Sequence, residues 1–207
     1  AEVREAHGSL AAGAETEDAV DIAARVMLVR DHGRLLFLSV KDESGHLQVM
    51  ASRAEMGDAA FEAARAIDAG DWMGFAGRVV ASRTGELSVL AKDCTLLGKA
   101  LRPLPAKARP LTDPELRARR RYLDLIVTPD ARRVADIRTS AIAGIRGFLA
   151  GRGYTEVETP VLQPDAGGAT ARPFITHHNA LDIEMYLRIA LELPLKRLIV
   201  GGMDRVF

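Results

Sequence analysis

The chain has 207 residues, enough for one large domain or two small ones, and its hydrophobic fraction of 48% is typical of a globular protein with a core. Lysine and arginine total 28, as do aspartate and glutamate, which excludes a strong net charge that would draw the whole chain to nucleic acid. The single cysteine, Cys94, excludes an internal disulfide. No stretch reaches the roughly 18 apolar residues of a membrane-spanning helix, and the N-terminus lacks the hydrophobic region of a signal peptide, so we expect a cytoplasmic protein without membrane contact.

Residues 1–19 are rich in alanine, glycine and glutamate and show little regular apolar pattern. We expect them to form a loose lead-in segment with at most a short helix. From residue 20 to residue 98, short runs with alternating apolar residues are separated by turn sequences. The sequence predicts strands at residues 21–30, 34–41, 46–51, 71–81 and 86–91.

One helix is expected between the third and fourth strands, at residues 55–67, with Phe61, Ala64 and Ile67 on a shared face. Three strands, a helix and two further strands are the order of an OB-fold, a barrel whose face binds oligonucleotides. Residues 20–98 are therefore predicted to form a five-stranded OB-fold barrel.

Three residues on the first three strands have side chains that suit single-stranded bases. Arg30 supplies a cation, Phe37 an aromatic platform, and Gln48 an amide with both a donor and an acceptor. Each also has a simpler interpretation, because Phe37 could be a core residue and Gln48 an ordinary surface residue of a strand.

Residues 99–112 are predicted to be a stiff, basic linker between two domains, because Pro103, Pro105 and Pro110 punctuate them. Thr112 or Asp113 can then cap a helix. Eight basic residues lie in the linker and this helix: Lys99, Arg102, Lys107, Arg109, Arg117, Arg119, Arg120 and Arg121. For the arginines of the helix, a solvated basic face and contact with nucleic-acid phosphates are equally compatible with the sequence.

A long helix is expected at residues 129–152, where apolar residues recur at three- and four-residue spacing. Gly153 should end it, and residues 154–159 alternate as a strand. The apolar stripe, which could pack on the helix's own domain or on another chain, consists of Val134, Ile137, Ala141, Ile145 and Phe148.

Residues 167–193 combine two glycines with an apolar run that ends at a single carboxylate, Glu192. Pro194 fits the first turn of a following helix. A carboxylate beside a glycine turn suits the ammonium group of a small substrate, although an ordinary strand, turn and helix would look the same. His177 and His178 are adjacent in a predicted strand and point to opposite faces, so we expect no metal site there.

The resemblance to class II lysyl-tRNA synthetases is carried by GGATARPFITHHNALDIEMYLRIALEL, LKRLIVGG, VKDESGHLQVM and TGELSVLAKDCTLLGKALRPLP. It implies that Gly168 and Glu192 receive the α-amino group of lysine. It also implies anticodon contacts for four residues of the barrel: Arg30, Phe37, Gln48 and Glu86. Leu191 and Pro194 depart from residues common in the family and affect local packing rather than the role of Glu192.

YTEVETPVL, after the long helix, resembles motif 1 of class II synthetases and implies a homodimer. The implied fold is mixed α+β, with the OB-fold barrel followed at residues 113–207 by part of an antiparallel-sheet catalytic domain. Motifs 2 and 3, with the ligands of ATP and Mg²⁺, would follow Phe207. We expect no catalytic residue and no activity in this chain alone.

The implied function of the full-length enzyme is attachment of L-lysine to lysine tRNA through lysyl-adenylate. Three alternatives remain. The chain could come from a non-catalytic tRNA-binding paralogue, from the synthetase half of a bifunctional protein that also forms lysylphosphatidylglycerol, or from a related class II ligase.

Overall fold

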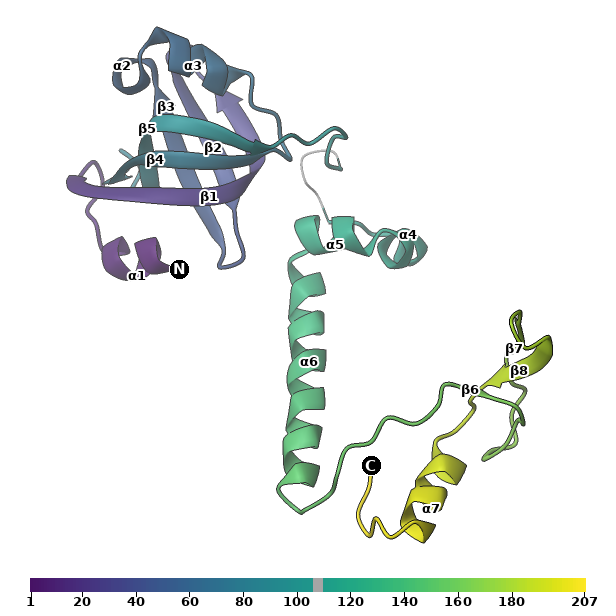
Figure 1. Ribbon diagram of the computed structural model, residues 1–207. Coiled ribbons are helices and arrows are strands. Elements are labelled where there is room, and N and C mark those ends of the chain that lie inside the picture. The colour runs from purple at the N-terminus through teal and green to yellow at the C-terminus, as the bar shows by residue number, and fades with distance from the viewer. Residues whose placement is uncertain (106–109) are drawn as a thin grey trace. The chain divides into compact units, whose positions relative to one another are not determined.

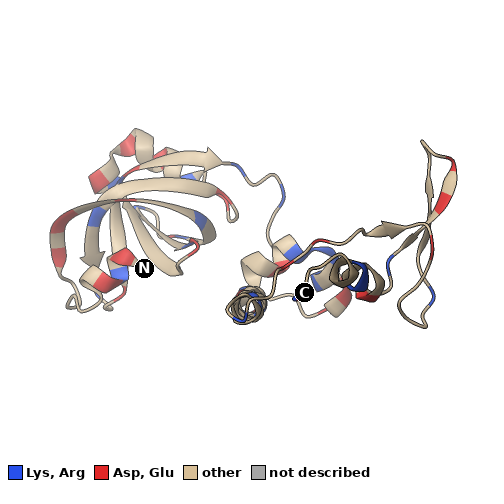
Figure 2. Cartoon of the chain, turned by 60° about the horizontal axis from the view of Figure 1, so that its bottom comes forward, with Lys and Arg blue, Asp and Glu red and all other residues tan. Residues whose placement is uncertain are grey.

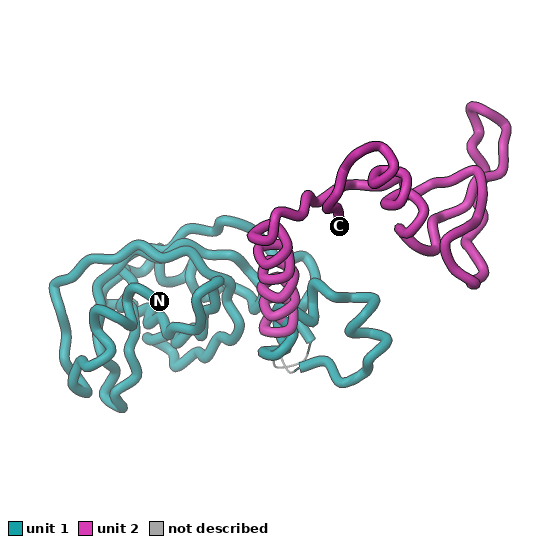
Figure 3. The backbone as a smooth tube through the Cα atoms, turned by 90° about the horizontal axis from the view of Figure 1, so that it is seen from below, with its two compact units in different colours: residues 1–131 teal, residues 132–207 magenta. Residues whose placement is uncertain are grey.

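The computed structural model describes residues 1–105 and 110–207, in two compact units of residues 1–131 and 132–207 (Figure 3). Two members of the predicted basic run, Lys107 and Arg109, lie outside the described residues. Acidic and basic residues are interspersed in both units (Figure 2).

The first unit is built on a closed five-stranded barrel (Figure 1). The strand order is β1-β2-β3-β5-β4, with β3 and β5 parallel and the other neighbours antiparallel. This arrangement confirms the predicted OB-fold. The strands are β1 Glu15–Asp31, β2 Leu35–Lys41, β3 His46–Ser52, β4 Trp72–Ala81 and β5 Leu87–Gly98.

Alternation along the strands sorts apolar and polar side chains between the interior and the outer face. On β2, Leu36, Leu38 and Val40 are buried, whereas Phe37 and Ser39 are only partly buried. Where the pairing of β4 with β5 shifts register, Gly77 is required, because a Cβ atom there would lie 2.2 Å from the carbonyl oxygen of Leu90. The barrel core includes Val26, Val49, Phe61, Phe75 and Val89.

The helix that we expected at residues 55–67 is wrong as a single element. It is two short helices, α2 Arg53–Met56 and α3 Asp58–Arg65, because Gly57 between them has a φ of 77°. Phe61 and Ala64 are buried on α3 as predicted, and Ile67 reaches the core from beyond the end of the helix.

The N-terminal segment contains a short helix, α1 Glu2–His7, but β1 begins well before the expected start of the barrel. Glu15 pairs with Val80, and Ala19 pairs with Arg78, so β4 provides a partner for this early part of β1. Sequence alternation alone missed the extension because its polar side chains are largely exposed.

The rest of the first unit is a helical arm, α4 Pro114–Arg119 and α5 Arg121–Val127. Asp113 caps α4 by accepting a hydrogen bond from the Glu115 amide at 3.0 Å. Lys41 on β2 joins the arm to the barrel, because its Nζ donates to the Ile126 carbonyl at 3.0 Å.

The second unit contains most of α6 Pro129–Ala150, which ends two residues before the expected position. Its apolar stripe is exposed: the exposed fractions are 65% for Val134, 56% for Ile137, 60% for Ile145 and 56% for Phe148. The stripe is therefore not packed against the described part of the second unit.

The strand expected at residues 154–159 is wrong. Only an isolated bridge forms, between Thr155 and Val206, because the Tyr154 amide bonds back to the Leu149 carbonyl and the remaining described backbone bonds of the segment reach only residues 205–207. A three-stranded antiparallel sheet does follow, in the order β6-β8-β7. Its strands are β6 Leu162–Gln163, β7 Ile175–His178 and β8 Ile183–Leu187, and α7 Glu192–Val200 comes next.

A search of the described residues for a helix that is both long and apolar enough to cross a membrane finds none.

The buried carboxylate of Asp71 ties the barrel to the start of the linker. It is 1% exposed and accepts hydrogen bonds at 2.9 Å from Lys99 Nζ and from the amides of Ala100 and Asp68. Burial raises the pKa of Asp71, but these hydrogen bonds outweigh it and hold the pKa below its ordinary value. Its ionised form therefore stabilises the fold at neutral pH.

We predict that Asp71→Asn lowers the free energy of unfolding by about 1–3 kcal/mol at pH 7, because a buried hydrogen-bonded charge is lost. Urea unfolding measures this. The matched control is Asp68→Asn, whose side chain is 72% exposed. The difference in the free energy of unfolding between wild type and Asp71→Asn should shrink as the pH falls from about 4 toward the folded-state pKa of Asp71. Equal losses in the two variants would contradict this account.

Candidate functional site

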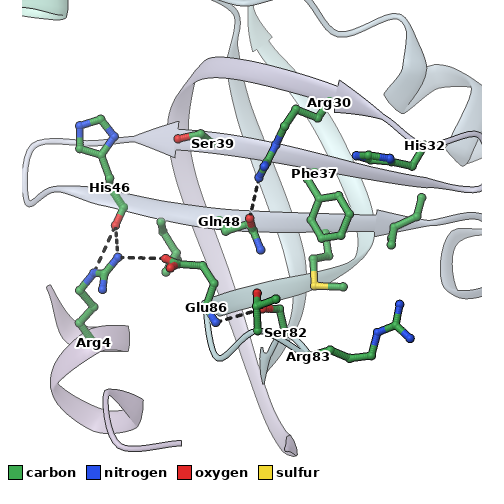
Figure 4. Close-up of a pocket in the computed structure, with 14 residues that line it drawn as sticks. Arg4, Arg30, His32, Phe37, Ser39, His46, Gln48, Ser82, Arg83 and Glu86 are labelled. Carbon is green, nitrogen blue, oxygen red and sulfur yellow. Dashed lines mark hydrogen bonds and ion pairs between the residues drawn. The ribbon is translucent and has the colours of Figure 1, made fainter. Parts of the chain in front are cut away.

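A pocket of about 590 Å³ lies on the outer face of the barrel (Figure 4). All four residues to which the resemblance gives anticodon contacts line it: Arg30, Phe37, Gln48 and Glu86. They come from the end of β1, from β2, from β3 and from the turn before β5. Four positions spread over 57 residues of sequence are thus brought to one surface.

The Phe37 ring is held between two neighbours. The Arg30 guanidinium carbon lies 5.5 Å from the ring centroid, and the His32 ring meets it edge-on at 5.6 Å. Arg30 reaches the ring because it is paired with Phe37 in the register of β1 and β2. Since Phe37 is on the outer face, the interpretation as a core residue is wrong, and the ring is a platform on which a base can stack.

A chain of hydrogen bonds fixes the orientation of the Gln48 amide. Its Oε1 accepts from Arg30 at 3.0 Å, and its Nε2 donates to Ser88 Oγ at 2.9 Å. Ser88 Oγ in turn donates to the Glu86 carbonyl at 2.9 Å. Gln48 is therefore part of a network and not an isolated surface residue. An amide held in one orientation can distinguish bases by their hydrogen-bonding edges.

Glu86 stands at the end of the turn that joins β4 to β5. Gly85 adopts a φ of 86°, its amide donates to the Ser82 carbonyl at 2.9 Å, and the Glu86 amide donates to Ser82 Oγ at 3.0 Å. These bonds fix the backbone and leave the Glu86 carboxylate on the pocket rim with 53% of its side chain exposed. An exposed carboxylate can accept hydrogen bonds from the donors of a base.

Sequence reasoning missed several residues that line the same pocket. Ser39 and Met50 could have been found by alternation, because they share the outer face with Phe37 and Gln48. His46 follows the same alternation on β3, whereas Arg4 carried no such signal. Burial, followed by the nearby charges of Lys41 and Arg4, lowers the pKa of His46.

The second expected site also brings its two residues together. Gly168 has a φ of 90°, and a Cβ atom there would lie 3.8 Å from Glu192 Cβ and 3.4 Å from Ala190 Cβ. Glu192 begins α7, with Pro194 in the first turn as expected. A hydrogen bond from Lys196 lowers the pKa of Glu192, and an ionised carboxylate at this position can receive an ammonium group.

Most of the arginines after the linker form ion pairs within the helical arm. Arg117 Nε and Arg121 Nη1 lie 2.9 and 2.7 Å from the buried carboxylate of Asp124, and Arg119 pairs with Glu115 at 2.8 Å. These contacts account for much of the run structurally. They favour a folding role over phosphate contact for Arg117 and Arg121.

The two adjacent histidines have separate local partners. His177 Nε2 lies 3.1 Å from Asp182 Oδ1, and His178 Nδ1 accepts from the Leu181 amide at 3.2 Å. Across residues 1–105 and 110–207 no group of three or more His, Cys, Asp or Glu residues is placed to hold a metal ion.

Comparison with known families divides the chain in two. Residues 20–97 match the model of the OB-fold nucleic acid binding domain, and residues 113–207 match the model of class II tRNA synthetases (D, K and N). The first match contains Arg30, Phe37, Gln48 and Glu86, and the second contains Gly168 and Glu192.

Curated relatives match along most or all of the chain. A lysine–tRNA ligase of Dehalococcoides mccartyi is 52% identical over 90% of this chain and 37% of its own length. The lysine–tRNA ligase of Synechococcus sp. is 49% identical over 100% of this chain and 41% of its own length. The lysine–tRNA ligase 1 of Mycobacterium tuberculosis is 53% identical, also over 100% of this chain and 41% of its own length. The chain thus spans about two fifths of these relatives.

Proposed function

We propose that the chain belongs to the class II tRNA synthetases and is the N-terminal portion of an enzyme that attaches lysine to its tRNA. The matches to an OB-fold nucleic acid binding domain at residues 20–97 and to class II tRNA synthetases at residues 113–207 support this proposal, as do the lysine–tRNA ligases to which the chain is similar. The observation that carries this proposal is the meeting of Arg30, Phe37, Gln48 and Glu86 in one pocket. A platform, a fixed amide, a cation and a carboxylate are the groups needed to read unpaired bases. The barrel would thus bind the anticodon of lysine tRNA.

In the same proposal, Gly168 and Glu192 bind the α-amino group of L-lysine. Their proximity and the ionised state of Glu192 support this role. In the whole protein, lysine would react with ATP to give lysyl-adenylate and pyrophosphate, and the lysyl group would pass to the tRNA. ATP and Mg²⁺ would bind residues outside this chain. Such an enzyme would work in the cytoplasm, where tRNA is charged.

We also propose that the protein is a homodimer through α6 and the residues of YTEVETPVL. The exposed apolar stripe of α6 supports an interface with a second copy, because such a face is normally covered. The matched regions support domains at residues 20–98 and 113–207, with 1–19 as a lead-in segment and 99–112 as a linker.

We predict that the chain binds a UUU anticodon stem-loop more tightly than a GUC stem-loop at fixed salt. Phe37→Ala should weaken UUU binding by about 5- to 150-fold, the equivalent of 1–3 kcal/mol for one stacked base. Fluorescence anisotropy measures both affinities, and salt is held constant because phosphate contacts depend steeply on it. Phe174→Ala, at an aromatic residue that is 79% exposed in the second unit, is the matched control. Equal, weak binding of both stem-loops would contradict the proposal.

For the amino-acid site, we predict that Glu192→Gln raises the KM for lysine in the full-length enzyme by about 10- to 150-fold, because a charge-assisted hydrogen bond is lost. Lysine-dependent pyrophosphate exchange measures this. Glu17→Gln, at an exposed position of β1, should leave the KM unchanged. An unchanged KM in Glu192→Gln would exclude Glu192 as the lysine ligand.

We predict that the 207 residues alone do not catalyse pyrophosphate exchange, although they bind RNA. The physical reason is that the described residues offer no cluster of three ligands for the Mg²⁺ that would stabilise the phosphoryl charge. The full-length enzyme is the positive control for the assay. Exchange by the short chain at the full-length rate would disprove the prediction.

A further inference from the structure

One residue of the anticodon pocket comes from α1, outside the region that matches the OB-fold model. Arg4 donates to the His46 carbonyl from Nη2 at 2.9 Å and from Nε at 3.3 Å. Its Nη2 also lies 3.7 Å from Glu86 Oε1 (Figure 4). The OB-fold match begins at residue 20, so this contact reaches the pocket from a segment that family membership does not assign to it.

The geometry explains how Arg4 can act on Glu86. The guanidinium group is planar and rigid, so two hydrogen bonds from one edge to the same carbonyl fix its plane. Since β3 holds the His46 carbonyl, the charge of Arg4 is fixed relative to the barrel. In the part of the chain that the structure describes, Arg4 is the ion-pair partner of the Glu86 carboxylate.

The exposure of this pair indicates what it contributes. The Arg4 and Glu86 side chains are 54% and 53% exposed, and exposed pairs add little to folding stability. The pair can still restrict the rotamers of Glu86, whose backbone is already held by Ser82. The effect is therefore on the direction in which the Glu86 carboxylate points in the pocket.

We propose that Arg4 is a positioning residue for the Glu86 carboxylate, so that α1 is a working part of the nucleic-acid site. This inference rests on the proposed anticodon-binding function. A carboxylate accepts hydrogen bonds, so it discriminates between bases by the place of their donors. Uridine carries a donor at N3, whereas cytidine carries an acceptor at the same place in the ring. A carboxylate held in one direction discriminates between them better than a mobile one.

The test uses the full-length protein and a UUU stem-loop in which each anticodon uridine in turn is replaced by cytidine. Arg4→Met and Glu86→Gln should each reduce the preference for uridine by roughly two- to tenfold, at the same single position. The double variant should lose no more of the preference for uridine than either single variant, because Arg4 acts through Glu86. Arg4→Lys should restore part of the preference. Arg34→Met, at an exposed arginine outside the pocket lining, is the matched control.

A uniform loss of affinity for all stem-loops, with a weaker salt dependence, would identify Arg4 as a phosphate contact and overturn the proposal. A second measurement needs no RNA. The carboxyl carbon resonance of Glu86 should shift in Arg4→Met and stay in place in Arg34→Met. An unmoved resonance also overturns the proposal. If wild type shows no preference for UUU over GUC, the anticodon function fails, and the resonance still reports separately whether Arg4 holds Glu86.

Discussion

Closure of the barrel is the constraint on which the pocket around Phe37 depends. Because β1 pairs with both β2 and β4, every strand has two neighbours, and each side chain must face either the core or the outer surface. Burying Leu36, Leu38 and Val40 therefore forces Phe37 outward between them. A slip of one residue in the register of β2 would bury Phe37 and destroy the pocket. The apolar core and the binding surface are two consequences of one alternation.

The succession of strands along the chain could be predicted because the alternation within each strand is a local property of the sequence. Alternation identified β2 and β3 closely, and the turn glycines separated them. The ends of β1 and β5 could not be predicted, because they are set by the length of β4 rather than by their own residues. The break at Gly57 was missed because a glycine between helix-forming residues can be either tolerated or used as a turn.

The candidate residues divide in the same way. Alternation and the family resemblance together gave the four predicted pocket residues, whereas Arg4 reaches the pocket only through the packing of α1 on the barrel. In the second unit, Gly168 lies close to Glu192, as the glycine pair and the single carboxylate in the sequence suggested, whereas their role toward lysine came only from the resemblance. The expected strand at residues 154–159 failed because a strand requires a partner, and alternation does not tell whether one is present.

The most direct test of the central claim is to map where a UUU anticodon stem-loop touches the chain by NMR. The account predicts that the ring resonances of Phe37 and the side-chain amide of Gln48 shift most, with Arg30 close behind, and that the arm around Asp124 stays nearly unchanged. Shifts concentrated on the arginines of α4 and α5, with the resonances of Phe37 and Gln48 unmoved, would contradict the account. RNA binding would then be assigned to the helical arm.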